Sequence, residues 1–155
     1  MHSERPPWLR TMATSVPESR ALRGRRMMLE WWLESWVPRS GRVFVDVGAN
    51  VGTWTHWLAP HFDRGYAVEP DPDAVVALRA KVPANVTIHP VGAWSTETTL
   101  TFSRFEQTVH TSAYFGEEGI NTGPRAGLVE LPCRPLDALA IAGPVDFVKC
   151  DTEGA

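Results

Sequence analysis

The stretch that decides the fold is RVFVDVGANVGTWTHWLAPHFDRGYAVE, residues 42–69. It opens with a β-branched and aromatic run at 43–45, typical of a buried strand, and then breaks into a glycine-punctuated turn at 48–52. Apolar residues at helical spacing follow from Trp54, and residues 66–68 form a second strand-like run. Strand, turn, helix and strand in this order predict one right-handed βαβ unit with parallel strands.

Four positions in this unit suit the binding of a ligand. Gly48 and Gly52 lack a Cβ atom, so the backbone can turn with positive φ and a ligand can approach it closely. Asp46 ends the first strand, and Glu69 follows the second strand, seventeen positions after Gly52. A carboxylate at the end of the second strand can accept hydrogen bonds from both hydroxyls of a ribose. The unit therefore predicts a nucleoside-binding crevice.

The glycine spacing indicates which nucleoside fits. A dinucleotide fingerprint, GxGxxG, counted from Gly48 needs glycine where this chain has Asn50 and Thr53. The fit to a nicotinamide dinucleotide is therefore poor, although a nicotinamide-dependent oxidoreductase remains an alternative. S-adenosyl-L-methionine carries no phosphate, so a looser turn that contains Cβ atoms is acceptable for it.

Length and composition set the class of protein. With 155 residues, 43% of them hydrophobic, the chain is long enough for one domain with a packed core. A net charge of -3 argues against a nucleic-acid partner. No apolar run is long enough to span a membrane, and the first residues lack a signal-peptide core, so we expect a cytoplasmic protein. Two cysteines, Cys133 and Cys150, predict neither a disulfide nor a metal site.

The segment before the βαβ unit has two parts. Residues 1–19 are rich in proline, serine and charge, which predicts a flexible lead-in. From residue 20 to residue 37, apolar side chains recur at spacings of three, four and seven, which predicts a helix that Pro38 stops.

After Glu69 the pattern predicts a further helix and strand. Asp73 can cap a helix over 74–82, and residues 86–89 read as a third strand. Residues 92–94 then follow at the carboxyl end of that strand, beside the place where an adenine would lie. Backbone groups there could read the adenine edge. Trp94 could flank the ring, or it could equally be an ordinary core aromatic.

Two more strands are predicted, at 98–104 and 128–134, because polar and apolar residues alternate there. Between them, residues 105–127 are polar and glycine-rich and too long for a passive connector. Such loops often carry specificity. His110 lies in this loop and could accept a proton, although a loop histidine is more often simply solvated.

The last part of the chain predicts a short helix over 136–142, ended by Gly143, and a buried strand over 146–150. That strand delivers Asp151 and Glu153 to the sheet edge that carries the crevice carboxylates. Ligands of open α/β sheets bind along this edge.

One protein family shares four motifs with this chain, in the order VDVGANVGTWT, AVEPDP, VGAWSTETTLTF and FVKCDTEGA. Over residues 42–155 the chain resembles the S-adenosylmethionine-dependent methyltransferases of the FkbM type. The resemblance implies an α/β, Rossmann-like class I methyltransferase fold, with a partial sheet of strand order 3-2-1-4 and helices on both faces. It also implies S-adenosyl-L-methionine as the cofactor and a hydroxyl acceptor on a sugar, glycan or natural-product-type small molecule.

The resemblance further implies roles for single residues. The expected cofactor-binding residues are Asp46, Gly48, Asn50, Gly52, Glu69, Gly92, Ala93, Trp94, Asp151 and Glu153. Methyl transfer mainly requires in-line placement of the acceptor oxygen, and a hydroxyl acceptor also benefits from a base. Asp151 is the first candidate for this catalytic base and His110 the second. Asp151 could instead only bind the cofactor or cap a turn.

Members of this family continue well past the EGA motif, whereas this sequence stops at Ala155. We therefore expect residues 20–155 to be the N-terminal part of a methyltransferase domain that lacks its C-terminal strands, with the 146–150 strand at an edge. Such a part is expected to bind cofactor weakly and to be inactive alone. A non-catalytic cofactor-binding fragment is thus a further alternative.

Overall fold

The computed structural model describes residues 37–105 and 125–152. The predicted lead-in and nearly all of the predicted N-terminal helix lie outside these ranges. All the helices and strands described belong to one compact unit, Pro38–Ala155. In chain order they are β1 (Gly41–Val47), α2 (Thr53–Leu58), the 3-10 turn η2 (Ala59–His61), β2 (Phe62–Val68), α3 (Pro72–Arg79), β3 (Val86–His89), β4 (Gly92–Ala93), β5 (Thr98–Phe105), β6 (Arg125–Arg134), the 3-10 turn η3 (Leu136–Ala138) and β7 (Phe147–Cys150).

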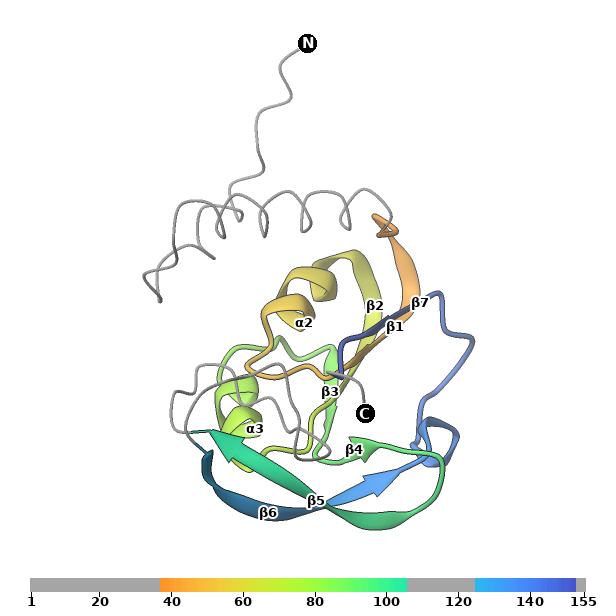
Figure 1. Cartoon of the computed structure of the whole chain (residues 1–155). Helices are drawn as coiled ribbons and strands as arrows, with labels where there is room; N and C mark the ends of the chain where they lie inside the picture. The colour runs from red at the N-terminus through yellow and green to blue at the C-terminus, as the bar shows by residue number, and fades with distance from the viewer. Residues whose placement is uncertain (1–36, 106–124, 153–155) are drawn as a thin grey trace, which may run out of the picture. The chain divides into compact units, whose positions relative to one another are not determined.

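The first sheet is parallel and has the order β3-β2-β1-β7 (Figure 1). This confirms the predicted order 3-2-1-4, with β7 as the fourth core strand. Helix α2 connects β1 to β2 and helix α3 connects β2 to β3, so both connections run in the same direction across the sheet. Because both crossovers have the same handedness, the two helices lie on one face of the sheet. The opposite face is covered, among the described residues, by Val91 and Ala93 and by Leu136, Leu139 and Ile141.

Strand β1 is buried on both sides, as expected for the centre of a parallel sheet. Val43, Val45 and Val47 join one apolar cluster with Tyr66, Val68 and Leu139. Phe44, which alternates with these valines, is fully buried and packs its ring 5.3 Å from that of Phe62. Asp46 alternates to the same face as Phe44, so a carboxylate enters the helix-covered side of the core.

The second sheet has the order β4-β6-β5 and begins three residues after β3 ends, at the carboxyl edge of the first sheet (Figure 1). Strands β5 and β6 are antiparallel, and their side chains Phe102, Leu131 and Cys133 form a small apolar core. Both strands were predicted, with the start of β5 at Thr98 and the end of β6 at Arg134, but the two ends next to the loop were not. Because Phe105 pairs with Arg125, the predicted loop is shorter at both ends, and residues 106–124 lie outside the described ranges.

The predicted cap of α3 was wrong by two residues. The helix begins at Pro72, and its cap is Asp71, whose Oδ1 accepts the N–H groups of Asp73 (2.8 Å) and Ala74 (3.3 Å). Proline suits the first helical position because it has no N–H group to leave unpaired. The cap therefore falls on the residue before the proline.

Two predictions near the end of the chain were also wrong. The helix expected over 136–142 is only the turn η3, since Leu139 is already extended (ψ 146°). This extended backbone carries Leu139 and Ile141 onto the apolar cluster of β1. Strand β7 is not fully buried, because among the described strands it pairs only with β1, and Val148 is 52% exposed.

Two further findings concern the described residues. None of their helices combines the length and the apolar character needed to cross a membrane. Cys133 and Cys150 are both free thiols, the first buried and the second exposed.

Asp146 joins the start of β7 to the start of β1. Its Oδ2 accepts the N–H groups of Arg42 (2.6 Å) and Val43 (3.1 Å), and its Oδ1 accepts the Arg42 guanidinium at 3.3 Å. These hydrogen bonds, first of all that of the Arg42 N–H, hold the pKa of Asp146 below its ordinary value. The ionised form is therefore the one that the folded state prefers.

We predict a pH-dependent loss of stability in Asp146→Asn. Since the folded pKa is lowered, the advantage of wild type over the variant should be constant above about pH 4 and disappear as the pH falls through the folded pKa. Chemical unfolding at a series of pH values measures this difference. The exposed Asp63→Asn is the matched control, and the same pH profile in both variants would refute the assignment.

Candidate active site

The turn between β1 and α2 uses left-handed backbone at alternate positions. The φ angles are 74° at Gly48, 49° at Asn50 and 83° at Gly52. Two of these positions are glycine, which takes positive φ freely, and the third is asparagine, which tolerates it better than most residues. The Asn50 Oδ1 also accepts the N–H of Val51 at 2.7 Å. The sequence GANVG is therefore explained by the conformation of the turn.

The turn satisfies its own backbone N–H groups. Gly48 and Ala49 donate to the carbonyl of Val68 at 3.0 and 3.1 Å, and Gly52 donates to the carbonyl of Ala49 at 2.9 Å. Asn50 donates to Glu69 and Val51 donates to the side chain of Asn50. All five N–H groups from 48 to 52 thus have acceptors within the protein. A phosphate-binding turn, by contrast, points free N–H groups at its ligand.

The two glycines of the turn are close to protein atoms rather than to open space. A Cβ atom on Gly48 would collide with the carbonyl oxygen of Asp151, and one on Gly52 would lie 2.5 Å from Cδ1 of Leu78. That the bare backbone at these two positions also admits a ligand stays a prediction. The missing Cβ atoms let the end of β7 and helix α3 approach the turn.

Glu69 is held firmly at the end of β2. Its Oε2 accepts the N–H of Asn50 at 2.7 Å, and its Oε1 accepts the N–H of Asp71 at 2.9 Å. The residue is 6% exposed. Burial raises the pKa of Glu69, while the two N–H groups and, more weakly, Lys149 oppose this rise. A carboxylate has about four acceptor positions, so two bonds leave capacity for others.

A buried ion pair stands behind the turn. Asp46 is fully buried, and its Oδ2 accepts the hydroxyl of Thr55 at 2.6 Å. Lys149 Nζ lies 3.0 Å from Asp46 Oδ1, an ion pair without hydrogen-bond geometry. The same Nζ donates to the carbonyl of Gly48 at 3.0 Å and lies 3.9 Å from Asp151 Oδ2. Lys149 therefore connects β1, the turn and the end of β7.

Lys149 was not among the residues identified from the sequence. Its signal was a lysine in the middle of the strand-like run FVKC, since a charged residue in a buried strand requires a partner. Asp46, which was expected to face the ligand, is that partner. Both of its oxygens have contacts inside the protein, so in this structure it positions the turn.

The remaining predicted residues fall into three groups. Asp151 follows β7, donates its N–H to the carbonyl of Val47 at 3.0 Å and keeps a side chain that is 68% exposed. Gly92 and Ala93 form β4 and pair with β6, and half-buried Trp94 packs against the core of the second sheet. His110 and Glu153 lie outside the described residues.

The carboxyl ends of β2 and β3 connect the two sheets. The N–H of Glu69 donates to the carbonyl of His89 at 3.1 Å, and β4 begins shortly after His89. The structure therefore brings together Glu69, the turn and Asp151 at one edge, whereas residues 92–94 belong to the adjoining sheet.

We predict that Gly52→Ala destabilises the protein by more than Gly143→Ala. Both glycines have positive φ, but a Cβ atom at Gly143 finds only Val43 Cγ2, at 3.9 Å. Gly143→Ala, the control, should therefore lose only the stability that the strained backbone costs, about 1–3 kcal/mol. Gly52→Ala should lose this and, in addition, the cost of the clash with Leu78. Chemical unfolding compares the two variants. Equal losses would show that the contact with α3 is unimportant.

We also predict that Lys149→Met costs about 3–5 kcal/mol of stability, because it leaves the Asp46 carboxylate buried without a partner of opposite charge. The double variant Asp46→Asn/Lys149→Met should recover much of this loss. Arg134→Met is the matched control: its pair with Glu97 is exposed and contributes about 0–1 kcal/mol. A loss in Lys149→Met no larger than in the control would contradict a buried pair.

Comparison with solved structures shows the fold. The structure is similar to methyltransferase FkbM from Methylobacillus flagellatus KT, with a TM-score of 0.50 and 17% identity over 96% of this chain and 41% of that chain. It also matches precorrin 8w decarboxylase from Methanobacterium thermoautotrophicum, with a TM-score of 0.32 and 28% identity over 48% of this chain and 40% of that chain. This chain thus spans about two fifths of the length of each.

Sequence comparison shows the family. A search of curated proteins finds no significant match. The family model described as the methyltransferase FkbM domain matches residues 46–155, from the end of β1 through the turn, the Glu69 strand and β7. This match covers well over half of the sequence, and the parallel sheet has the strand order expected for the fold. The chain therefore belongs to the methyltransferase FkbM domain family.

Proposed function

We propose that this chain is the cofactor-binding part of an S-adenosyl-L-methionine-dependent methyltransferase that O-methylates a hydroxyl group of a sugar or natural-product-type small molecule. Residues 20–155 are then the N-terminal part of the methyltransferase domain, and the cytoplasm is the proposed location. The observation that carries the proposal is the Glu69 carboxylate, fixed by two backbone N–H groups beside a turn whose own N–H groups are all occupied.

Glu69 has the properties required of a ribose-binding residue. It follows β2 at the carboxyl edge, and each of its two carboxylate oxygens accepts one hydrogen bond from a backbone N–H. The positions that remain can accept the two hydroxyls of a ribose. Because the N–H groups of Asn50 and Asp71 already hold the carboxylate, binding costs little further ordering of this side chain.

The turn supports S-adenosyl-L-methionine over a nicotinamide dinucleotide. A pyrophosphate needs free N–H groups at the turn, and those of residues 48–52 are all bonded within the protein. S-adenosyl-L-methionine has no phosphate and needs no free N–H groups at the turn, so the shape of this turn is enough to accommodate it. The nicotinamide-dependent oxidoreductase is therefore the weaker alternative.

The site also offers groups for the acceptor side. When bound, S-adenosyl-L-methionine supplies a methyl group activated by its sulfonium. Asp151, exposed at the end of β7 and 3.9 Å from Lys149 Nζ, is our candidate to accept the proton of the acceptor hydroxyl. His110 remains the second candidate and Glu153 a cofactor-binding candidate. The backbone of residues 92–94 is proposed to border the adenine, while Trp94 serves the packing of the second sheet.

We predict that Glu69→Gln weakens the binding of S-adenosylhomocysteine by roughly 1.5–3 kcal/mol, as hydrogen bonds to a charged acceptor are lost. Calorimetry measures this, with the exposed Glu130→Gln as the matched control. Because the pKa of Glu69 is raised, wild-type affinity should be highest above that pKa and fall during acidification at a pH above the ordinary value of 4.5. The variant should not show this fall.

Two outcomes of this titration would count against the proposal. Unchanged affinity in Glu69→Gln would remove Glu69 from the site. Binding of NADH but not of S-adenosylhomocysteine by the wild-type chain would favour the oxidoreductase instead.

A further inference from the structure

The peptide group between Gly48 and Ala49 is held from both sides. Its N–H, which belongs to Ala49, donates to the carbonyl of Val68 at 3.1 Å, at the end of β2. Its C=O, which belongs to Gly48, accepts a hydrogen bond of 3.0 Å from Nζ of Lys149 in β7. Strands β2 and β7 are the two neighbours of β1 in the first sheet. The orientation of this one peptide group therefore depends on both of them.

A lysine is suited to selecting this orientation. Gly48 has no Cβ atom and takes a φ of 74°, so its own sterics leave the following peptide group more freedom than another residue would. A lysine ammonium has three donors and no acceptor. If the peptide group rotated, the N–H of Ala49 would leave Val68 and the ammonium would lose the carbonyl. Lys149 therefore favours the orientation in which the carbonyl points toward β7.

The peptide group that follows carries the contact with Glu69. The N–H of Asn50 donates to Oε2 of Glu69 at 2.7 Å, and Asn50 itself has left-handed backbone, with a φ of 49°. Because the chain is continuous, the direction of this N–H depends on the orientation of the peptide group before it. Burial raises the pKa of Glu69, and the charge of Lys149 is one of the weaker influences that oppose this rise. The lysine thus acts on Glu69 through the turn and through its charge.

Lys149 has a second partner, and the two contacts make different demands. Nζ lies 3.0 Å from Oδ1 of Asp46, which accepts no hydrogen bond among the described residues, so this contact depends on charge. The contact with Gly48 is a hydrogen bond, which depends on a donor. When the charges of Asp46 and Lys149 are removed together, the first demand disappears and the second is no longer met. Stability and the orientation of the turn can thus be separated.

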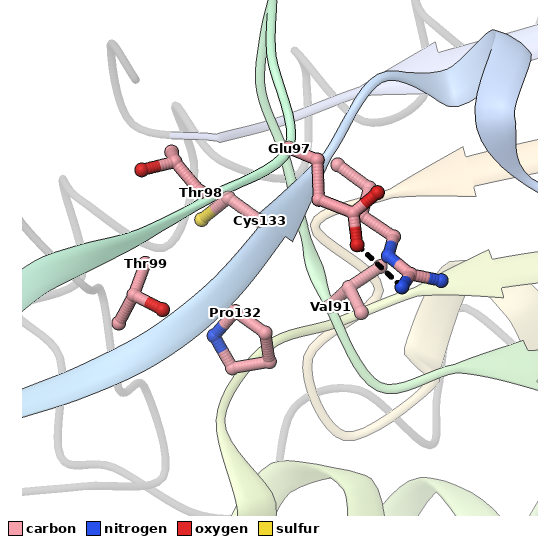
Figure 2. Close-up of a pocket in the computed structure, with 7 residues that line it drawn as sticks. Val91, Glu97, Thr98, Thr99, Pro132 and Cys133 are labelled. Carbon is pink, nitrogen blue, oxygen red and sulfur yellow. Dashed lines mark hydrogen bonds and ion pairs between the residues drawn. The ribbon is translucent and has the colours of Figure 1, made fainter.

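Two other ion pairs of the described residues offer comparisons, because they lie away from the turn. Asp146 pairs with Arg42 at the amino ends of β1 and β7. Glu97 pairs with Arg134 on the second sheet, where both side chains are exposed; a dashed line marks this pair in Figure 2. Lys149 differs from both arginines, since its side chain is 13% exposed and it bonds a carbonyl of the turn.

We propose that Lys149 is a positioning residue for cofactor binding. It orients the Gly48–Ala49 peptide group, which presets the turn and the carboxylate of Glu69 for the ligand. The effect on the cofactor rests on the proposed function, whereas the effect on the turn does not.

The decisive variant is Asp46→Asn/Lys149→Met, whose stability should be largely recovered. In the full 155-residue chain without ligand, the amides of Ala49 and Asn50 should exchange with solvent about tenfold faster than in wild type, while those of β2 exchange at nearly unchanged rates. Calorimetry should show that S-adenosylhomocysteine binds about tenfold more weakly. Amide NMR measures the exchange and verifies that the variant is folded.

Three further variants serve as comparisons. Asp146→Asn loosens the same pair of strands at their other end, and Arg134→Met removes an exposed ion pair, so both should bind S-adenosylhomocysteine as wild type does. Lys149→Arg keeps a positive charge and several donors, and it should bind more tightly than the double variant.

Three results would overturn the proposal: recovery of both stability and wild-type affinity in the double variant, wild-type exchange of Ala49 and Asn50 in that variant, or an equal loss of affinity in Asp146→Asn. If the double variant does not fold, Lys149→Arg decides. Its affinity and its Ala49 exchange rate should change together or not at all, and a change in one alone contradicts the proposal.

Failure of the proposed function is recognised separately. If the wild-type chain does not bind S-adenosylhomocysteine, the cofactor assignment is wrong, and the exchange rates of Ala49 and Asn50 then decide whether Lys149 orients the turn. Binding by wild type and by the double variant with equal affinity leaves the cofactor assignment intact and removes Lys149 from it.

Discussion

The carboxyl edge of the first sheet depends on a buried charge pair. Asp46 and Lys149 come from neighbouring strands, and their pairing offsets the cost of placing charged groups in the core. Through the carbonyl of Gly48 the lysine also fixes the turn, and through Thr55 the aspartate fixes the start of helix α2. The place where a ligand can meet the sheet is thus determined by an interaction that the ligand itself need not touch.

Two acidic residues that look alike in the sequence have different roles for this reason. Asp46 and Glu69 each follow a run of apolar strand residues. Asp46 points into the helix-covered core and is committed to Thr55 and Lys149, whereas Glu69 lies just beyond its strand and bonds two backbone N–H groups. Only Glu69 keeps acceptor capacity at the sheet edge. The proposed function therefore places cofactor recognition on Glu69 and gives Asp46 the task of holding the turn.

The second sheet gives this edge a neighbour of different chemistry. One face of this sheet carries a small apolar core, and the other carries the exposed Glu97–Arg134 ion pair. Because β4 begins soon after β3 ends, the carbonyl of His89 accepts the N–H groups of both Glu69 and Val91 and so joins the two sheets.

By itself the sequence determined the βαβ unit, the third strand and the alternating strands of the second sheet, because strand patterns and left-handed turn positions are local properties of neighbouring residues. Together with the family motifs it also predicted the sheet order and the grouping of Glu69, the turn and Asp151 at one edge. Only the tertiary structure decided that Lys149 is the partner of Asp46, that Gly48 makes room for the carbonyl of Asp151, and that residues 92–93 pair with β6. Each of these joins residues far apart in the chain, and such contacts depend on register and burial, which no local pattern contains.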